Sequence, residues 1–272
     1  MAAVLHRLKI ARAVASATYK EWSAYRTHSM VSILVGPAAF LVQVSIWSAV
    51  LSQGGAIGGM TLQQMIAYYG VSTLIYYLIM DFADWNLQML IHTGKYLTFA
   101  LRPLHHRFFA LSQKIGHRIL GFLFEFIPVL VIFVFLFKVD LRPASWPWMV
   151  VSVALSFLIQ FYINYTIGIS GFWLVKTQGL RSVVYLLTSV CSGSLFPLAL
   201  LPKALQTAAF FLPFQFTIYV PSMVFTGHYS LGGLTLGMAG IVGAQAVYLL
   251  LLAGTSEVLF RLGMKRFTAV GA

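Results

Sequence analysis

Six long apolar runs constrain this chain more than any other feature of its sequence. They lie at about residues 30–51, 62–80, 119–137, 148–175, 182–201 and 234–260. About 20 apolar residues, rising 1.5 Å each in a helix, cross about 30 Å of hydrocarbon. Only 9% of residues are charged and 60% are hydrophobic, whereas about a quarter of a soluble domain is charged. We therefore predict an all-α, polytopic membrane protein with six transmembrane helices, forming one domain over residues 1–272.

Positive charge is distributed unevenly among the segments between these runs. Fifteen of the 18 Lys and Arg residues fall on one side. They are Arg7, Lys9, Arg12, Lys20, Arg26, Lys95, Arg102, Arg107, Lys114, Arg118, Lys176, Arg181, Arg261, Lys265 and Arg266. The other side carries Lys138, Arg142 and Lys203. Because Lys and Arg in short loops stay in the cytoplasm, we predict a bacterial-type inner (plasma) membrane protein with both termini cytoplasmic. The net charge of +12 then reflects topology and contact with anionic lipids, not nucleic acid.

Two segments outside the six runs have patterns that predict specific structures. Residues 1–29 interleave apolar and basic residues without the apolar core of a signal peptide, and they predict an amphipathic helix at the cytoplasmic interface. Residues 202–225 are apolar but interrupted by Pro202, Pro213 and Pro221. Irregular backbone at membrane depth persists only inside protein or beside a cavity. We therefore expect a re-entrant pair of short helices in this second segment.

Ionisable residues inside the runs are costly in a membrane and deserve separate interpretation. Glu125, in the third run, either faces the bundle and lines a path, or makes a packing contact with a neighbouring helix or headgroup water. Asp81 and Asp84 share a helix face where the second run meets the cytoplasm and favour a structural role. Glu257 and Arg261, spaced i, i+4, predict an ordinary helix pair.

The sequence contains no convincing catalytic motif. The phosphate-binding pattern GxxxxGK[ST] is absent, since Gly94-Lys95 is followed by Tyr96, so this chain alone is not predicted to be an ATPase. Ser194 would be the nucleophile of an intramembrane protease, but His228 lies in the outer segment, and close helix packing is the simpler interpretation.

The remaining polar candidates are equally sparse. His105 and His106 lie beside basic residues without a carboxylate or Cys at ligand spacing, and they predict a cytoplasmic basic patch instead of a metal site. The one cysteine, Cys191, excludes an internal disulfide. No catalytic, cofactor-binding or metal residue is predicted.

Residues 91–104, IHTGKYLTFALRPL, resemble the segment after the second span of type 2 ABC exporter permeases (the ABC-2 family). Within that family they are most similar to the branch with a Gly followed a few residues later by Leu-Arg-Pro. The run SGSLFP at 192–197, followed by Leu201-Pro202, Leu212-Pro213-Phe214 and Pro221 with Gly227, is similar to the family's fifth span and re-entrant region. The resemblance extends over nearly the whole chain.

The resemblance implies a half-transporter that pairs with a second six-span permease, as a homodimer or a heterodimer. Each permease would dock on a separate ATP-binding subunit, which binds ATP and Mg, through a coupling helix at residues 94–104. In that helix Phe99 and Leu101 would be apolar anchors, Lys95 and Arg102 would supply charge, and Pro103 would end the helix. The basic character of this segment departs from the expected pattern.

The function implied is outward movement of a hydrophobic or amphipathic substrate. The substrate class stays open among lipids, glycolipids, saccharide polymers, peptides and hydrophobic drugs. Two alternatives stay open as well: a membrane scaffold or assembly subunit without a transport path, and a membrane-embedded enzyme.

Overall fold

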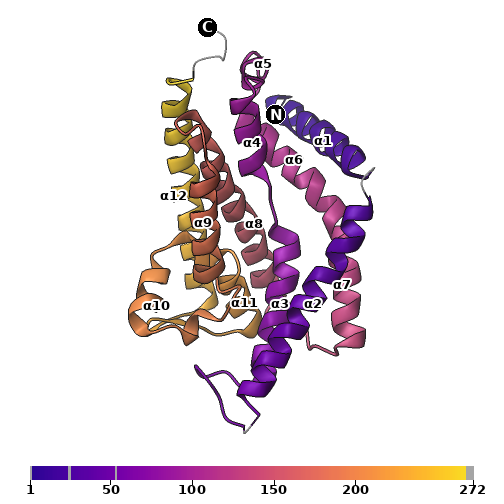
Figure 1. Ribbon diagram of the computed structural model, residues 1–272, viewed down its shortest axis with the longest axis vertical. Helices are drawn as coiled ribbons and strands as arrows, with labels where there is room; N and C mark the ends of the chain where they lie inside the picture. The colour runs from indigo at the N-terminus through magenta and orange to yellow at the C-terminus, as the bar shows by residue number, and fades with distance from the viewer. Residues whose placement is uncertain (1, 24–25, 53, 268–272) are drawn as a thin grey trace.

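The computed structural model describes residues 2–23, 26–52 and 54–267 and is almost entirely helical (Figure 1). Five helical segments are long and apolar enough to cross a membrane: Val31–Val50, Leu62–His92, His106–Leu136, Trp146–Phe172 and Met238–Met264. Both ends of the chain and the short helix α5 (Tyr96–Ala100) lie at one end of the bundle. The α2–α3 connection and α10 (Lys203–Phe210) lie at the opposite end (Figure 1).

The N-terminal helix α1 (Ala2–Ser23) lies across α6 (His106–Gly121). The two backbones are close, since a Cβ on Gly116 would lie 2.3 Å from the carbonyl oxygen of Ala15. Only glycine fits at this crossing. A helix forms over residues 2–23 of the predicted segment 1–29, residues 26–29 belong to α2, and residues 1, 24 and 25 lie outside the described part of the chain.

Helices α2 (Arg26–Val50) and α3 (Leu62–Ile79) form an antiparallel pair. The hydroxyl of Tyr77 enters the backbone of α2, donating to the Ser32 carbonyl at 2.5 Å and accepting from the Gly36 N–H at 2.9 Å. A hydroxyl inserted into the helix ladder, next to Pro37 inside the helix, is a recognised cause of a kink. The middle of α2 is therefore held open by a side chain from α3.

After α3 the chain breaks at residues 80–82 and resumes as α4 (Ala83–His92). Oδ1 of Asp81 accepts from the N–H groups of Phe82 and Ala83 at 2.9 and 3.2 Å. Asp81 thus satisfies backbone donors that the start of a helix leaves unpaired.

The third membrane-crossing segment begins earlier than the sequence indicated, at His106 instead of Ile119. It comprises α6, a π-helical turn η1 (Phe122–Phe126), α7 (Ile127–Val131) and a second π turn η2 (Ile132–Leu136). Pro128 supplies no N–H to the carbonyl four residues earlier, and its ring crowds that carbonyl. The wider η1 turn, in which Ile127 N–H donates to the Phe122 carbonyl, accommodates this proline and contains Glu125.

The fourth segment matches the fourth run and the fifth does not match its run. Helix α8 (Trp146–Ile169) continues into a 3-10 turn, η3 (Ser170–Phe172). Helix α9 (Gln178–Cys191) has only 14 residues, about 21 Å, and is too short to cross the hydrocarbon alone. The prediction of a continuous fifth transmembrane helix is wrong because the chain turns at Gly193, whose φ is +81°. The chain still passes from the α5 end to the α10 end over residues 178–202 (Figure 1).

Short elements close the far end of the bundle. They are η4 (Leu198–Leu200), α10, η5 (Pro213–Phe216), α11 (Tyr219–Thr226) and the antiparallel strands β1 (Tyr229–Leu231) and β2 (Leu234–Leu236), in which Tyr229 pairs with Leu236. The last helix, α12 (Met238–Met264), begins after the hairpin, four residues later than the sixth apolar run.

The three prolines of this region lie where proline is tolerated. Pro202 caps α10, Pro213 begins η5 and Pro221 falls in the first turn of α11, where a missing N–H leaves no helical bond unmade. Two short helices form here, as predicted, and most of α11 is buried.

Candidate functional site

Helix α5 lies within the segment predicted to contact an ATP-binding subunit, and it has an exposed side and a buried side. Gly94, with φ +71°, turns the chain out of α4. Lys95, Arg102 and Pro103 are exposed, and Leu101 is 82% exposed. Phe99 is only 5% exposed, so the prediction that it is a surface anchor is wrong, because it packs inside the chain.

The buried side of α5 belongs to an aromatic cluster that we call the α5 cluster: Tyr96, Phe99, His106, Phe109, Tyr165, Phe172 and Phe260. Phe99 lies edge-on to His106 and Phe109, with ring centroids 4.7 and 5.0 Å apart. Tyr96 contacts Phe172 and Phe260 at 5.5 and 6.4 Å. Burial raises the pKa of Tyr96 to about 12, so its hydroxyl is neutral at physiological pH. The cluster joins α5 to α6, α8 and α12.

The two histidines at the start of α6 have different surroundings. The ring of His106 is buried, stacks on Tyr165 and has Nδ1 3.1 Å from the Tyr165 hydroxyl, so the prediction that it belongs to a surface basic patch is wrong. His105 lies 3.6 Å from Glu257. Partial burial lowers the pKa of His105, although the Glu257 carboxylate opposes this. At neutral pH the ring is uncharged, and Glu257 pairs instead with Arg107 at 3.2 Å and Arg261 at 2.7 Å.

Two ion pairs hold the start of α4 and the break before it against neighbouring helices. The carboxylate of Asp81 lies 3.9 Å from Lys114 Nζ on α6, and both side chains are at most 4% exposed. Lys114 also donates to the Phe157 carbonyl of α8 at 2.7 Å. The carboxylate of Asp84, which is fully buried, lies 2.8 Å from Arg181 Nε at the start of α9. These pairs connect the start of α4 and the break before it to α6 and α9, and Lys114 also contacts α8.

Lys114 and Arg181 are the residues that sequence analysis treated as ordinary cytoplasmic charges. No spacing rule within the sequence identifies their partners, since Asp81 and Lys114 are 33 positions apart and Asp84 and Arg181 are 97 apart. One sequence feature could have indicated the ion pairs. Asp81 and Asp84 lie at the end of an apolar run, in a chain with only six acidic residues. Such carboxylates need partners inside the bundle.

Glu125 faces the interior of the bundle and takes part in a network across three helices. Its side chain is 5% exposed, with Oε2 3.5 Å from Arg118 Nη1 and Oε1 accepting from the Ser32 hydroxyl at 3.0 Å. Arg118 Nη1 also donates to the Tyr77 carbonyl at 2.7 Å. The network therefore fixes η1 against α2 and α3 near the Tyr77 wedge.

A small cavity of about 310 Å³ with a mixed polar and apolar lining lies between α2, α3 and the turn that follows α9. Its polar lining consists of Ser32, Gln43, Tyr69, Ser72, Thr73, Tyr76, Tyr77 and Ser194. The Tyr68 and Tyr69 hydroxyls donate to the carbonyls of Gly193 and Leu195 at 2.6 and 3.2 Å. A Cβ at residue 193 would lie 2.5 Å from the Tyr68 hydroxyl, so glycine is required at this turn.

The described residues give little geometric support to an intramembrane protease or a metal site. The Ser194 hydroxyl donates to the Ser189 carbonyl at 3.0 Å and no histidine lines its cavity. Residues 2–23, 26–52 and 54–267 contain no group of three His, Cys, Asp or Glu side chains arranged to hold a metal ion.

The architecture defines a multi-pass membrane protein, and its sequence lacks the phosphate-binding pattern GxxxxGK[ST]. A sequence model for the ABC-2 family of transporter proteins matches residues 38–271. The chain belongs to this family, whose membrane components lack an ATPase domain of their own and work with ATP-binding subunits. Neither the curated proteins nor the solved structures that were compared with the chain gave a match.

Proposed function

We propose that this chain is the permease subunit of an ATP-binding cassette exporter, moving a hydrophobic or amphipathic substrate outward across a bacterial-type plasma membrane. Both termini and α5 lie in the cytoplasm in this proposal. The support is the charge distribution of fifteen against three, together with the position of both termini and α5 at one end of the bundle (Figure 1). ATP and Mg bind to the partner subunit, and the permease itself holds no cofactor.

Helix α5 and its flanking residues form the contact with the ATP-binding subunit. The observation that carries this assignment is the pairing of an exposed ridge, Lys95, Leu101 and Arg102, with the buried α5 cluster. A displacement of α5 reaches α6, α8 and α12 through packed rings. Packed interiors transmit displacement because they are close to crystalline density.

The transport path lies beside α2, α3 and α9, where a second six-span permease completes it. The small cavity between α2, α3 and the turn after α9 lies at this face. None of the residues of α9 is buried in the single chain, which fits a helix covered by a second permease. Residues 202–225 close the path from outside as a re-entrant pair.

Co-expression with a cognate ATP-binding subunit tests the proposal. ATP hydrolysis is expected to rise when the two are purified together and to fall in a Leu101→Ser variant. Removing a leucine from an interface loses about 1.5–3 kcal/mol of burial, which weakens docking by at least about tenfold. The matched control is Leu205→Ser, an exposed leucine at the α10 end, which is expected to leave hydrolysis unchanged.

Whether an ATP-binding subunit is recruited distinguishes an exporter from a scaffold subunit or a membrane-embedded enzyme. A scaffold or a membrane-embedded enzyme would give no ATP-binding subunit in the purified complex, and Leu101→Ser would then change nothing. Either result would contradict the proposal.

A further inference from the structure

The hydroxyl of Tyr77 on α3 lies between two backbone groups of α2 that bond to each other in a regular helix. It donates to the Ser32 carbonyl at 2.5 Å and accepts from the Gly36 N–H at 2.9 Å, whereas in a regular helix residue i+4 donates directly to residue i. The next helical bond is missing as well, because Pro37 has no N–H to offer the Ile33 carbonyl. Helix α2 is therefore held here by a side chain of α3 instead of by its own backbone.

The contact between Tyr77 and α2 is close, and it can be exchanged for a backbone bond. A Cβ on Gly36 would lie 2.6 Å from the Tyr77 hydroxyl, so only glycine admits the ring. When the hydroxyl leaves, the Gly36 N–H can donate to the Ser32 carbonyl directly, and the net loss is one hydrogen bond. One such bond shifts an equilibrium by about two- to tenfold. Helix α2 is therefore an element with two states of similar free energy.

Tyr77 lies at one end of the small cavity between α2 and α3. Helix α2 runs from the α5 end of the bundle towards the opposite end, and α3 runs back (Figure 1). Among the residues that line the cavity, Gln43 and Tyr69 therefore lie towards the α10 end, and Ser32 and Tyr77 lie towards the α5 end. The Tyr77 contact thus joins the two walls of the cavity on its α5 side, which faces the cytoplasm in the proposed orientation.

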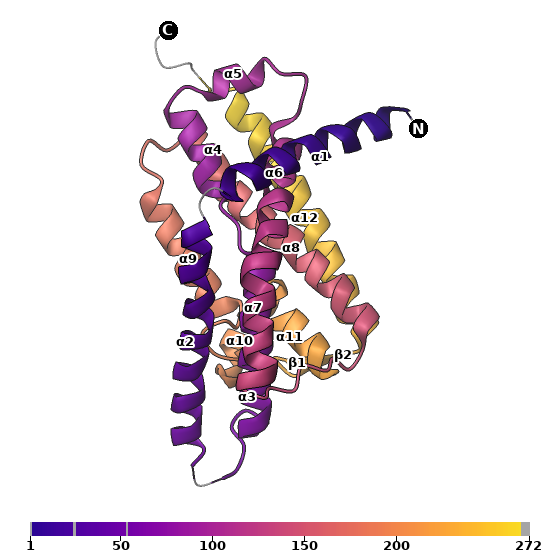
Figure 2. The same cartoon turned by 90° about the vertical axis from the view of Figure 1, so that its right-hand side faces the viewer.

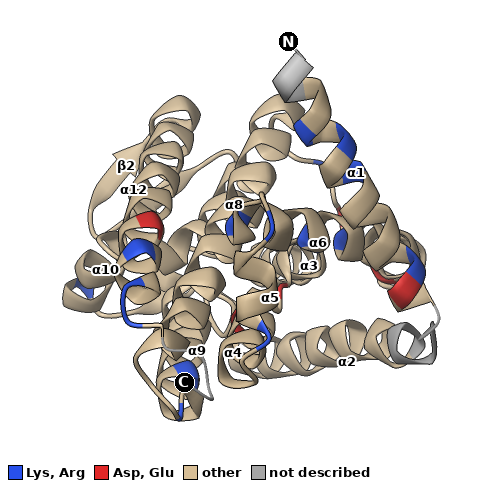
Figure 3. Cartoon of the chain, turned by 90° about the horizontal axis from the view of Figure 1, so that it is seen from above, with Lys and Arg blue, Asp and Glu red and all other residues tan. Residues whose placement is uncertain are grey.

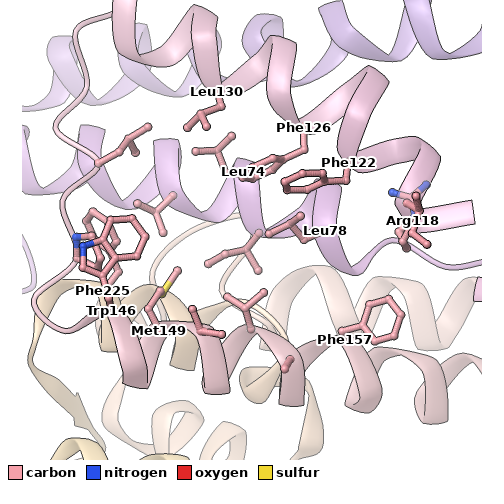
Figure 4. A pocket seen from close by; sticks show the side chains of 18 of the residues that line it. Leu74, Leu78, Arg118, Phe122, Phe126, Leu130, Trp146, Met149, Phe157 and Phe225 are labelled. Carbon is pink, nitrogen blue, oxygen red and sulfur yellow. The ribbon is translucent and has the colours of Figure 1, made fainter. Parts of the chain in front are cut away.

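Helix α2 lies at the edge of the bundle (Figure 2, Figure 3). Residues 31–50 contain no Lys, Arg, Asp or Glu, so no ion pair fixes this stretch. The Ser32 hydroxyl donates to Glu125 at 3.0 Å, which attaches α2 to η1. Helix α3 also borders an apolar groove of about 910 Å³ between α3, α6–α7 and α8, lined by Leu74 and Leu78 among others (Figure 4). Because close packing resists displacement, the cavity and the groove make a separation of α2 and α3 at Tyr77 easier.

We propose that Tyr77 is the inner gate residue of the permease, which positions α2 against α3 and closes the small cavity towards the cytoplasm. In the closed state, which is the state of this structure, its hydroxyl bridges Ser32 and Gly36. In the open state the Gly36 N–H donates to the Ser32 carbonyl, and residues 26–36 move away from α3 about the Ser32–Glu125 bond. Substrate then enters the cavity between α2 and α3 from the cytoplasmic side. The inference rests on the proposed orientation and transport path.

The reaction rate of a cysteine inside the cavity tests the gate. Thr73 lines the cavity, and Thr73→Cys is made in a Cys191→Ala background. A membrane-impermeant maleimide is added to inside-out vesicles, which expose the cytoplasmic side, or to intact cells. Tyr77→Phe removes the hydroxyl and keeps the ring, so the rate in inside-out vesicles is expected to rise about two- to tenfold, and the rate in intact cells to stay unchanged. An unchanged rate in the vesicles, or a rise in intact cells alone, would overturn the proposal.

Two further variants and a reference position make the test specific. Tyr76→Phe removes a neighbouring hydroxyl that lines the same cavity and is expected to leave the rate unchanged. Gly36→Ala places a Cβ against the Tyr77 hydroxyl and is expected to raise the rate as Tyr77→Phe does. Ser256→Cys, at a fully buried position of α12, is expected to stay unreactive when combined with Tyr77→Phe. An equal rise in Tyr76→Phe, or reaction at position 256, would mean a general loosening of the bundle and would contradict the gate.

The gate and the exporter proposal can fail separately. The rates are measured on the permease without an ATP-binding subunit, so the expected rates stay the same when the chain recruits no such subunit. Rates that do not respond to Tyr77→Phe, in a permease that recruits and stimulates its ATPase, would reject the gate alone. Where Tyr77→Phe does not fold, Gly36→Ala carries the same expectation.

Discussion

Charged residues inside this protein act in pairs from different helices. Arg118 and Glu125, two turns apart in the third segment, are bonded to α3 and α2, and the Asp81–Lys114 pair connects the break between α3 and α4 to α6. Hydropathy assigns Lys114 and Arg118 to a cytoplasmic loop because it counts charges without reference to partners. Glu125 is buried beside Arg118 and bonded to Ser32 of α2, so it faces the bundle and also makes a packing contact with a neighbouring helix.

Removing one member of the Arg118–Glu125 pair is expected to destabilise the protein. Glu125→Ala leaves the Arg118 guanidinium buried without its carboxylate, at a cost of about 3–5 kcal/mol. Replacing both residues, as Arg118→Met with Glu125→Gln, leaves no buried charge and is expected to cost less. Thermal unfolding of the purified protein in detergent measures both.

The partly exposed Glu257 provides the control for this comparison. Glu257 also pairs with arginines, but its side chain is 22% exposed, and Glu257→Ala is expected to cost less than about 1 kcal/mol. If Glu125→Ala were as stable as Glu257→Ala, the Arg118–Glu125 network would contribute nothing to the fold.

At the scale of elements, most differences between the predicted and the observed structure lie in the short helices, α5 and α9. Hydropathy predicted five of the six crossings as helices, because each is a continuous apolar stretch with regular backbone. It extended the fifth through Ser192, Gly193 and Ser194, since these small residues do not lower hydrophobicity enough to mark a turn. It also could not tell which side of α5 is buried, because five residues are too few to define a periodicity.

The link between α4 and α9 is expected to depend on Arg181. Arg181→Ala leaves Asp84 buried with only the Tyr185 hydroxyl as a side-chain partner, 3.2 Å away. Loss of the opposite charge from a buried carboxylate costs up to about 3–5 kcal/mol. Both the melting temperature and the stimulated ATP hydrolysis should therefore fall, with partial recovery in Arg181→Lys.

Lys176 supplies a nearby control for the charge change itself. It is exposed, precedes α9 by two residues and forms no ion pair within the described chain. Lys176→Ala should behave like the wild type, and an equal loss in both variants would mean that net charge, and not the Asp84–Arg181 contact, matters.

For the whole molecule, the start of α1 and the end of α12 lie at one end of the bundle (Figure 1), as expected for termini that share one side of the membrane. Even with α9 shortened, residues 178–202 still pass between the two ends, so the parity predicted from six apolar runs is retained. The sequence can predict an orientation because the prediction depends on where Lys and Arg lie and not on side-chain packing.

Cysteine labelling from one side of the membrane tests this orientation. In a Cys191→Ala background, Ala56→Cys in the α2–α3 connection should react with an impermeant reagent added to intact cells. Ala100→Cys in α5 should react only after the membrane is opened. Both positions are exposed, so a lack of reaction reflects sidedness. Reaction of both residues in intact cells would contradict the orientation.

The central claim is that the end of α5 contacts an ATP-binding subunit, and a photo-crosslinking amino acid at position 101 tests it most directly. In the assembled complex this side chain is expected to crosslink to the ATP-binding subunit, since Leu101 is 82% exposed beside Arg102. The same amino acid at Leu205, at the opposite end of the bundle, should give no such product. A crosslink from position 205, or none from position 101 in an active complex, would contradict the account.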